Sequence, residues 1–339
     1  MLKRLGSRTV VFQTPPVIVG HANAVGKKEG EGPIADSFDY INDDAFFGER
    51  TWEKAESRMQ KEALTRALDK SGLAPSEIDY IFAGDLLNQC VGTAFCIRDT
   101  DIPFFGLYGA CSTMGESITL AAMILDGGFA SNAAAMTSSH FSGAERQYRM
   151  PNQYGGQRTP TAQWTVTGAG AVILSREGSG PCVRAAAVGK VVDLGIKDAA
   201  NMGAAMAPAA YDTLTAFFSD TGTRPADYDL IVTGDLGKLG KDIIIDFFRQ
   251  DGVDISPNYN DCGVMIFDLK KQDMHAGGSG CGCSASVLTG YILNGMRAGK
   301  WNNVLFAPTG ALMSPTVTQQ GESIPGICHL LHISNSREG

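Results

Sequence analysis

The chain has 339 residues, of which 44% are hydrophobic and 19% charged, so it is globular and long enough for one large domain or two ordinary ones. Its formal net charge of −8 excludes a dominant nucleic-acid surface, because binding to phosphates needs a clustered excess of lysine and arginine. No run of 18 or more apolar residues occurs, so no membrane-spanning helix is predicted.

The N-terminal stretch MLKRLGSRTVVFQTPP is a poor signal peptide, because its apolar run is short and ends at Pro15 and Pro16. Eight cysteines in a chain of this length do not make the dense pattern of a secreted disulfide scaffold. We therefore expect a reducing, cytoplasmic compartment. Peripheral attachment to a membrane through protein partners stays open.

Residues 21–50 show no clear periodicity and have no counterpart later in the chain, so we predict a long loop or flap there. A helix is predicted over 52–71, followed by a buried strand at 81–83 and the triplet Gly-Asp-Leu. The same order returns as a helix over 204–221, a strand at 230–233 and a second Gly-Asp-Leu. Asp85 in the first triplet therefore corresponds to Asp235 in the second.

A longer match supports the duplication. Residues 109–140, which begin GACST, align without gaps onto 280–311, so Gly109 falls on Gly280 and Gly128 on Gly299. Both segments predict a glycine turn, a helix, a glycine-containing loop and a strand.

We infer two similar half-domains, 1–180 and 181–339, packed as one unit because no long linker separates them. Alternation of strand and helix predicts an α/β fold with pseudo-symmetric halves and mixed, mainly parallel sheets covered by helices. Ligands of such sheets bind at the carboxyl ends of strands, where Asp85, Cys111, Asp235 and Cys281 are expected. The predicted pocket therefore lies between the halves.

A duplicated α/β half with Gly-x-Cys at a helix start resembles the thiolase-like superfamily, which includes thiolases and ketoacyl synthases. Within it, the chain resembles the stage V sporulation protein AD family of spore-forming Firmicutes. The blocks that carry this closer resemblance include AGDLLNQ (83–89), GACST (109–113), TVTGAGAV (165–172), MGAAMAPAA (202–210), AGGSGC (276–281) and TGALMSPT (309–316).

This resemblance implies a function in dipicolinic acid binding and in loading of dipicolinate into the developing spore. It also implies a homodimer, membrane subunits of the stage V sporulation A complex as partners, and a peripheral location at the spore inner membrane, in the mother cell or forespore. The dipicolinate would occupy the former thiolase active-site pocket.

In condensing enzymes of the thiolase-like superfamily, a cysteine thiolate attacks a thioester and two further groups, His-His or His-Asn, handle the proton and the oxyanion. Cys111 fits the nucleophile position. No histidine or asparagine occurs at 233–235 or 278–284, where the partners are expected. His140 and His275 remain as residues that could reach the pocket. An acyltransferase that uses Cys111 is therefore the alternative to a ligand-binding protein, and a structural subunit with a vestigial pocket is the second alternative.

For dipicolinate, a planar ring with two carboxylates, we predict two helix starts facing one pocket, with N–H groups of Cys111–Thr113 and Gly282–Ser284 toward the anion. The candidate ligand residues are Cys111, Ser112, Thr113, Ser139, His140, Asp85, Gln89, Asp235, Gly282, Cys283, Ser284 and Thr309. No protein-held cofactor is predicted, although Asp85 and Asp235 could share a calcium ion with the ligand. The simpler interpretation is that both aspartates cap the helices that follow them.

Two further motifs have competing interpretations. Cys281-x-Cys283 lacks the Cys-x-x-Cys spacing of zinc and redox motifs and has no second pair, so no metal site is predicted. Arg146 and Arg149 either steer an acidic ligand or belong to a solvated helix end.

Overall fold

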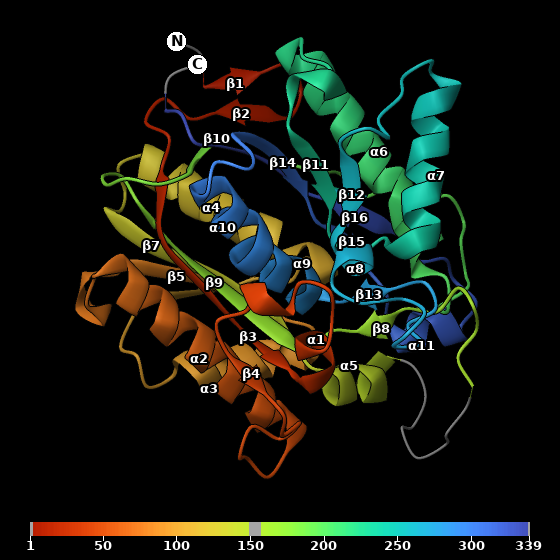
Figure 1. Ribbon diagram of the computed structural model, residues 1–339, viewed down its shortest axis with the longest axis horizontal. Coiled ribbons are helices and arrows are strands. Elements are labelled where there is room, and N and C mark those ends of the chain that lie inside the picture. Colours follow the sequence, from red (N-terminus) through yellow and green to blue (C-terminus); the bar gives the residue numbers. More distant parts are fainter. Residues whose placement is uncertain (1–2, 149–156, 338–339) are drawn as a thin grey trace.

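The computed structural model describes residues 3–148 and 157–337, which form a layered α/β protein (Figure 1). The first half contains β1 (Arg4–Leu5), β2 (Thr9–Val11), β3 (Val17–Gly26), α1 (Lys27–Gly30), β4 (Ile41–Asn42), α2 (Trp52–Ser71), β5 (Tyr80–Asp85), α3 (Val91–Ile97), β6 (Phe104–Gly106), α4 (Thr113–Asp126), β7 (Asn132–Ser139), α5 (Phe141–Tyr148), β8 (Trp164–Thr165) and β9 (Gly168–Ser175).

The second half repeats this plan with a longer set of terminal strands. It contains β10 (Cys182–Ala187), α6 (Met202–Thr221), β11 (Leu230–Thr233), α7 (Gly237–Gln250), β12 (Tyr259–Asp261), α8 (Cys262–Met265), β13 (Gly278–Ser279), α9 (Cys281–Val287), α10 (Leu293–Arg297), β14 (Asn303–Ala307), β15 (Thr309–Ala311), α11 (Pro315–Gln319), β16 (Gly326–Cys328) and β17 (Leu330–Ser334).

The hydrogen-bonded strand order is the same in both halves: β3-β9-β7-β5-β6 in the first and β10-β17-β14-β11-β12 in the second. In each of these five-strand paths four strands share one direction, and only β9 or β17 runs against them. The two paths join where Val17 of β3 pairs with Cys182 of β10. The predicted pseudo-symmetric α/β fold with mixed, mainly parallel sheets is confirmed.

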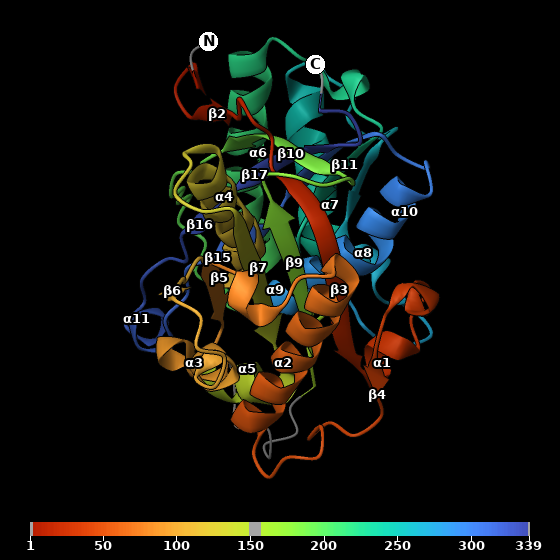
Figure 2. The ribbon, with the colours of Figure 1, turned by 90° about the vertical axis from the view of Figure 1, so that its left-hand side faces the viewer.

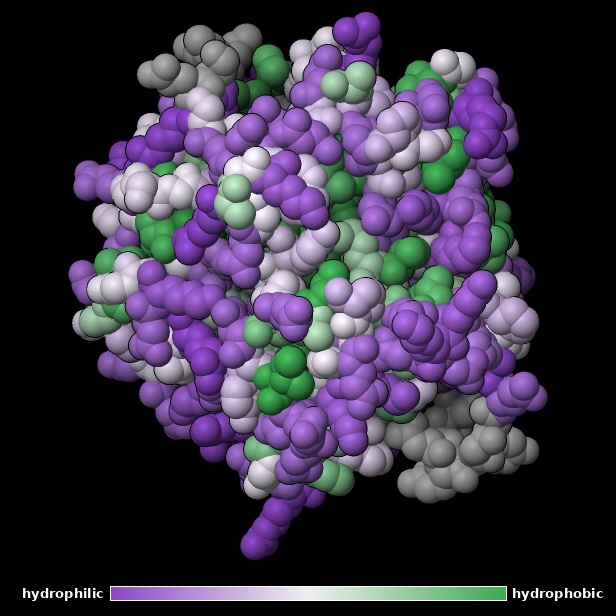
Figure 3. All heavy atoms as spheres, in the orientation of Figure 1, coloured by the Kyte–Doolittle hydropathy of each residue, from purple (hydrophilic) through white to green (hydrophobic). Residues whose placement is uncertain are grey.

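Three hydrophobic layers hold the sheets and helices together. Side chains of α2 pack against β3, β5, β7 and β9 on one outer face, and side chains of α6 pack against β10, β11, β14 and β17 on the other. Figure 2 shows α2 across the face of the first sheet. Most of the face in Figure 3 is covered by hydrophilic residues, so these apolar layers lie inside.

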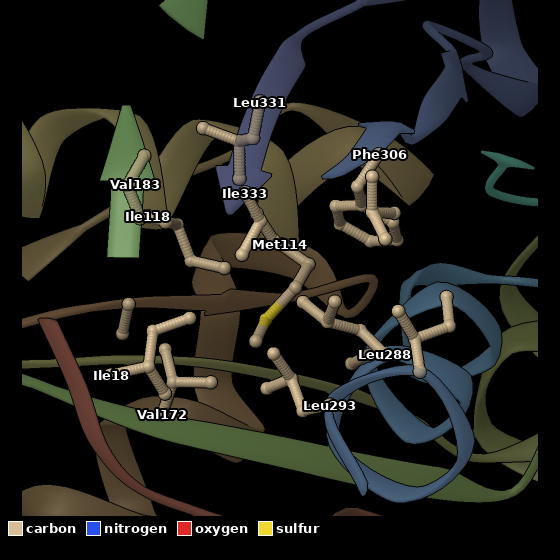
Figure 4. Close-up of a cluster of buried hydrophobic side chains, with 14 of the residues drawn as sticks. Ile18, Met114, Ile118, Val172, Val183, Leu288, Leu293, Phe306, Leu331 and Ile333 are labelled. Atoms are coloured by element: carbon tan, nitrogen blue, oxygen red, sulfur yellow. The ribbon is translucent and has the colours of Figure 1, made fainter. Parts of the chain in front are cut away.

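The central layer lies between the two halves and joins them. Met114 and Ile118 of α4 meet Leu293 of α10, Val172 of β9 and Phe306 of β14 in one buried cluster (Figure 4). Burial of each such side chain contributes about 1.5–3 kcal/mol. The halves therefore share a core rather than a mobile interface.

The helices predicted from the sequence agree closely with those observed. Helix α2 spans Trp52–Ser71 as predicted; Thr51 caps its start by accepting from the Lys54 N–H, and Gly72 ends it in the left-handed conformation. Helix α6 begins two residues before the predicted start, because the side chain of Asn201 caps it.

The prediction of a loop over 21–50 is wrong for its first part. Residues 21–26 belong to β3. This strand is buried on both faces and includes the polar residues His21 and Asn23, so its sequence lacks the alternation of apolar and polar residues that would predict a strand. The remainder folds as α1, β4 and turns. It packs against the first half, where the Ala45 carbonyl bonds to His140 Nε2 at 2.8 Å.

Among the described residues, no helix has the length and apolar character needed to cross a bilayer.

Candidate functional site

Cys111 lies on a 3₁₀ turn, Ala110–Ser112, directly before α4. Ala110 adopts a left-handed φ of 50°, which is unusual for a residue with a Cβ and marks a constrained turn. The turn packs against β15 of the other half so closely that a Cβ on Gly310 would lie 2.3 Å from the Gly109 carbonyl oxygen. Cys111 is therefore at the interface of the halves, as predicted.

Asp235 follows β11 and is fully buried beside Cys111. Its Oδ2 accepts the Gly280 N–H at 3.0 Å and the Ser279 hydroxyl at 3.3 Å, and its Oδ1 accepts the Thr309 hydroxyl at 3.0 Å. The idea that Asp235 caps the helix after it is wrong. Asp261 does that instead, by accepting the N–H groups of Leu236 and Gly237 at 2.9 Å.

The electrostatics of this pair oppose a nucleophilic thiolate. Burial raises the pKa of the Cys111 thiol well above its usual value, and the charge of Asp235 raises it further. Burial also raises the pKa of Asp235, to about 6, although its hydrogen-bond donors, Cys111 among them, partly offset that rise. Near neutral pH the arrangement is a protonated thiol beside a carboxylate.

No imidazole assists Cys111. All five histidines are described, and each ring has its polar contact elsewhere: His21 to the Thr289 carbonyl, His140 to that of Ala45, His275 to that of Thr159, His329 to the Gly189 N–H and His332 to the Asn303 side chain. No histidine of the described chain therefore lines the pocket as a proton acceptor for Cys111, and the carboxylates nearest to it are those of Asp235 and Glu145.

Cys111 opens onto a hollow of about 410 Å³, its open mouth included. The lining residues are mostly apolar or aromatic: Leu86, Tyr108, Ala110, Cys111, Ala144, Glu145, Tyr148, Thr165, Met202, Ser279, Ala311 and Met313. They come from both halves, which is typical of a ligand pocket. None of these described lining residues is a lysine or an arginine.

Tyr108 and Tyr148 are hydrogen-bonded to each other along the wall of the hollow. Their hydroxyl oxygens are 2.6 Å apart, and the Tyr148 hydroxyl donates to the Leu86 carbonyl at 2.5 Å. Because each phenol has one hydrogen, Tyr108 donates to Tyr148, and the Tyr108 oxygen keeps only acceptor capacity. The hydroxyl of Thr165 is likewise used, since it donates to Glu145 at 2.8 Å.

The second helix start, at α9, uses its polar groups inside the protein. The Gly282 N–H donates to Ser139 Oγ at 3.1 Å, the Cys283 N–H to the Gly280 carbonyl at 3.0 Å, and the Ser284 hydroxyl to the Cys281 carbonyl at 3.3 Å. At the first helix start, the Ser112 N–H donates to the Gly109 carbonyl at 3.1 Å, and the hydroxyls of Ser112 and Thr113 also bond within the turn. A ligand at either start would have to compete with these bonds.

Cys111 is the only one of the twelve predicted ligand residues in the described lining of the hollow, and three of the others use their side chains or backbone elsewhere. Asp85 acts as a cap, accepting the N–H groups of Leu87 and Thr93 at 2.8 and 2.7 Å. Gln89 is exposed in a left-handed conformation, and His140 faces Ala45. Arg146 pairs with Glu53 and lies over the Trp52 ring, which agrees with the interpretation of a solvated helix end. Arg149 lies outside the described residues.

The hollow also includes residues that the motifs did not single out as ligands. Tyr108 comes directly before the GACST block, but Tyr148 and Glu145 reach the site only because α5 folds over it. Sequence analysis also missed Glu56, which is buried beside Asp85; burial and the Asp85 charge raise its pKa well above the usual range. No cluster of three or more His, Cys, Asp or Glu suited to a metal occurs among the described residues.

A sequence-family profile described as Stage V sporulation protein AD matches residues 6–334. The curated Stage V sporulation protein AD of Bacillus subtilis (strain 168) is 45% identical over 328 residues, which cover 97% of each chain.

Solved structures of similar fold include OleA and a 3-oxoacyl-(acyl carrier protein) synthase III. A single-residue variant of OleA from Xanthomonas campestris superimposes with a TM-score of 0.62 at 14% identity, covering 98% of this chain and 100% of that one. The 3-oxoacyl-(acyl carrier protein) synthase III of Xanthomonas oryzae gives 0.60 at 13%, covering 96% and 100%. At such identities the likeness establishes the thiolase-like fold alone.

Proposed function

We propose, from the premise that this chain belongs to the stage V sporulation protein AD family, that it binds dipicolinic acid in the hollow beside Cys111 and helps to load dipicolinate into the developing spore. The pairing of the Cys111 thiol with the Asp235 carboxylate carries this proposal. The pocket of the thiolase-like fold is present, but the group beside the cysteine is a carboxylate and not the imidazole that condensation requires. The carboxylate keeps the thiol protonated.

The lining favours a planar aromatic ligand. Tyr108, Tyr148 and Leu86 offer apolar surface on one side, with Met202 and Met313 also in the wall. Aromatic rings and thioethers pack well against a flat ring. The space inside the hollow that water-sized spheres can occupy is only about 30 Å³, so its wall would have to open to admit dipicolinate.

The charges at the hollow favour dipicolinate that arrives with calcium over the bare dianion. Glu145 lines the hollow and Asp235 lies behind Cys111, whereas no described lining residue is cationic. A calcium ion held chiefly by the two carboxylates of dipicolinate would neutralise the charge of the ligand. Glu145 could complete the oxygen shell of that calcium ion. We treat calcium as cargo of the ligand, not as a resident cofactor.

We also propose the homodimer and the partners that the family implies. β6 is an edge strand whose only sheet neighbour among the described residues is β5, and Phe104 and Phe105 on it are exposed. Such an edge invites pairing with a second copy. Membrane subunits of the stage V sporulation A complex would then receive the ligand from a dimer that is peripheral at the spore inner membrane.

Calorimetry tests the ligand directly, with dipicolinate titrated in the presence and absence of calcium. We expect saturable heat, stronger with calcium, and a Glu145→Gln variant should lose most of the advantage of calcium. Glu49→Gln, an exposed glutamate exchanged in the same way, is the matched control. Absence of binding at millimolar ligand in both conditions would refute the proposal.

Acyl transfer by Cys111 is the second candidate, because the cysteine does line the hollow. Incubation with acyl-CoA followed by intact-mass measurement decides it. An acyl adduct that is present in the wild type and absent in Cys111→Ala would establish the enzyme. If neither dipicolinate nor acyl-CoA reacts and membrane partners still co-purify, the chain is a structural subunit.

A further inference from the structure

The end of the molecule that bears both termini carries a group of cations that the ligand site does not use. Figures 1 and 2 show the N- and C-terminal ends at the top and α5, which borders the hollow, in the lower half. We define the terminal basic face as Lys3, Arg176, Arg184 and Arg337, together with Phe129.

Hydrogen bonds and close approaches place these residues side by side. The Arg337 side chain donates to the Arg176 carbonyl at 3.1 Å, and the Arg184 side chain donates to the Ser336 carbonyl at 3.2 Å. A Cβ on Gly128, the residue before Phe129, would lie 4.0 Å from Arg176 Nη1. Lys3 reaches the end of α4, just before the same glycine turn, where it pairs with Asp126 at 3.0 Å.

The charge of this face is positive although the whole chain is acidic. Three described carboxylates lie at it against four cations: Asp126, which Lys3 neutralises, the exposed Glu177, and Asp227, which lines the same hollow as Arg184. None of the three arginines is within ion-pair distance of another described residue's carboxylate. Cations left unpaired on a protein with a net charge of −8 are available for an anionic partner.

A groove lined by polar residues and by Val19 and Leu73 adjoins Arg176. It encloses about 1280 Å³ with its open side included, and its hydroxyl and amide lining comes from Thr14, Ser71, Ser131, Asn132 and Ser175. Such groups suit a phosphate and the hydroxyls of its ester better than an apolar ligand. Glu177 also lines the groove, and its charge partly offsets that of Arg176 there.

Phe129 adds an apolar contact next to the arginines. Its side chain is 74% exposed, the largest exposed fraction among the exposed large hydrophobic residues of the described chain. It projects just after the Gly127–Gly128 turn at the end of α4, where no sheet or helix covers it. Aromatic side chains flanked by cations are typical of protein surfaces that lie in the headgroup region of a bilayer.

We propose that the terminal basic face docks on an anionic phospholipid surface, with lipid phosphates at Arg176, Arg184 and Arg337 and with Phe129 in the interfacial layer. The proposal rests on the proposed peripheral location and identifies the surface that contacts the membrane. Cations near an anionic bilayer each contribute attraction that falls off within a Debye length, so the contact is weak and salt-sensitive. In this orientation the hollow stays open to the aqueous side.

Flotation of the purified full-length chain with vesicles tests the proposal. We expect binding to phosphatidylglycerol–phosphatidylcholine vesicles, little binding to pure phosphatidylcholine, and release at 0.5 M salt, a condition chosen to shorten the roughly 10 Å Debye length. Arg176→Gln combined with Arg337→Gln should weaken binding at least about tenfold, and Phe129→Ser should weaken it severalfold.

The controls remove two exposed cations and one exposed apolar side chain from other surfaces. Lys238→Gln with Arg249→Gln deletes two exposed cations from α7, and Leu194→Ser removes an exposed apolar side chain. Both should float like the wild type. Equal loss in test and control variants, or no binding to anionic vesicles, overturns the proposal, as does full competition by free glycerol phosphate at the same phosphate concentration. Calorimetry with dipicolinate on the same variants stays unchanged, so failure here is distinguishable from failure of the ligand site.

Discussion

The thiol of Cys111 faces the buried carboxylate of Asp235, and the two groups shift each other's protonation. Four donors converge on that carboxylate, from Cys111, Ser279, Gly280 and Thr309. A cysteine at the start of a long helix normally has a lowered pKa. Here burial and the neighbouring negative charge outweigh the helix.

Asp235→Asn should therefore make Cys111 more reactive. Removal of the charge lowers the thiol pKa while the hydrogen bonds of the site are largely kept. We expect alkylation of Cys111 by iodoacetamide at pH 8 to rise roughly tenfold, the change in thiolate fraction that one pK unit brings. Peptide mass mapping measures it, with Cys111→Ala identifying the site. An unchanged rate would show that burial alone suppresses the thiolate.

Glu29→Gln should change the pH dependence of stability. Burial raises the pKa of Glu29 to about 7 against a usual 4.5, partly offset by the Thr167 N–H that Glu29 accepts at 3.0 Å. Because the folded state holds the extra proton, this group favours folding below pH 4.5, and that contribution is lost as the pH rises through 7. The glutamine variant does not lose stability in this way, because its side chain does not ionise. Between pH 5 and pH 8 its free energy of unfolding, compared with that of the wild type, should therefore rise by up to about 3 kcal/mol.

Urea unfolding at the two pH values measures this difference. Glu49→Gln, at an exposed position, is the control and should leave the pH dependence as it is in the wild type. A parallel pH dependence of Glu29→Gln and wild type would mean that Glu29 is ionised in the folded protein throughout that range.

Phe105→Asp should convert the proposed dimer into a monomer. The Phe105 side chain is 50% exposed on the edge strand β6, stacked on Phe82 with ring centroids 5.1 Å apart. A charge on this edge prevents strand pairing between copies. Light scattering after gel filtration gives the mass, and Leu194→Asp, a similarly exposed site elsewhere, should remain dimeric. A dimer that survives Phe105→Asp would place the interface on another surface.

Gly282→Ala should destabilise the contact between the halves. A Cβ there would lie 2.2 Å from the Gly168 carbonyl oxygen and 2.6 Å from Ser139 Oγ, and the backbone cannot yield easily. We expect a loss of about 2 kcal/mol or more in the free energy of unfolding, the range typical of overpacking in a core. Gly143→Ala is the control, since the nearest atom to its Cβ would be the flexible Leu87 Cδ2 at 3.3 Å. Equal stability of the two variants would contradict the close packing.

Much of the fold could be predicted because it depends on local pattern and on repetition. The helix over 52–71 has a cap residue before it and a glycine after it, and both are read directly from the letters. The alignment of 109–140 onto 280–311 places Gly128 on Gly299, and both have a left-handed φ, 79° and 75°. The strand β3 escaped prediction because a strand buried on both faces has no alternation.

The candidate site was predictable only in part. The position of the site beside Cys111 could be predicted from the glycine turn and the helix start. Tyr108, Tyr148 and Glu145 meet there because α5 folds back over the turn. No residue spacing in the sequence indicates that contact.

The order of residues was enough to establish the duplication, the succession of helices and strands, the position of Cys111 and the lack of a histidine at the expected partner positions. It could not separate Asp85 from Asp235, which occupy the same place in the same Gly-Asp-Leu triplet. Only in the folded chain do the two differ, since Asp85 caps its own turn and helix while Asp235 faces the thiol. A buried carboxylate takes its role from the donors packed around it, and those donors arrive from segments far away in the chain.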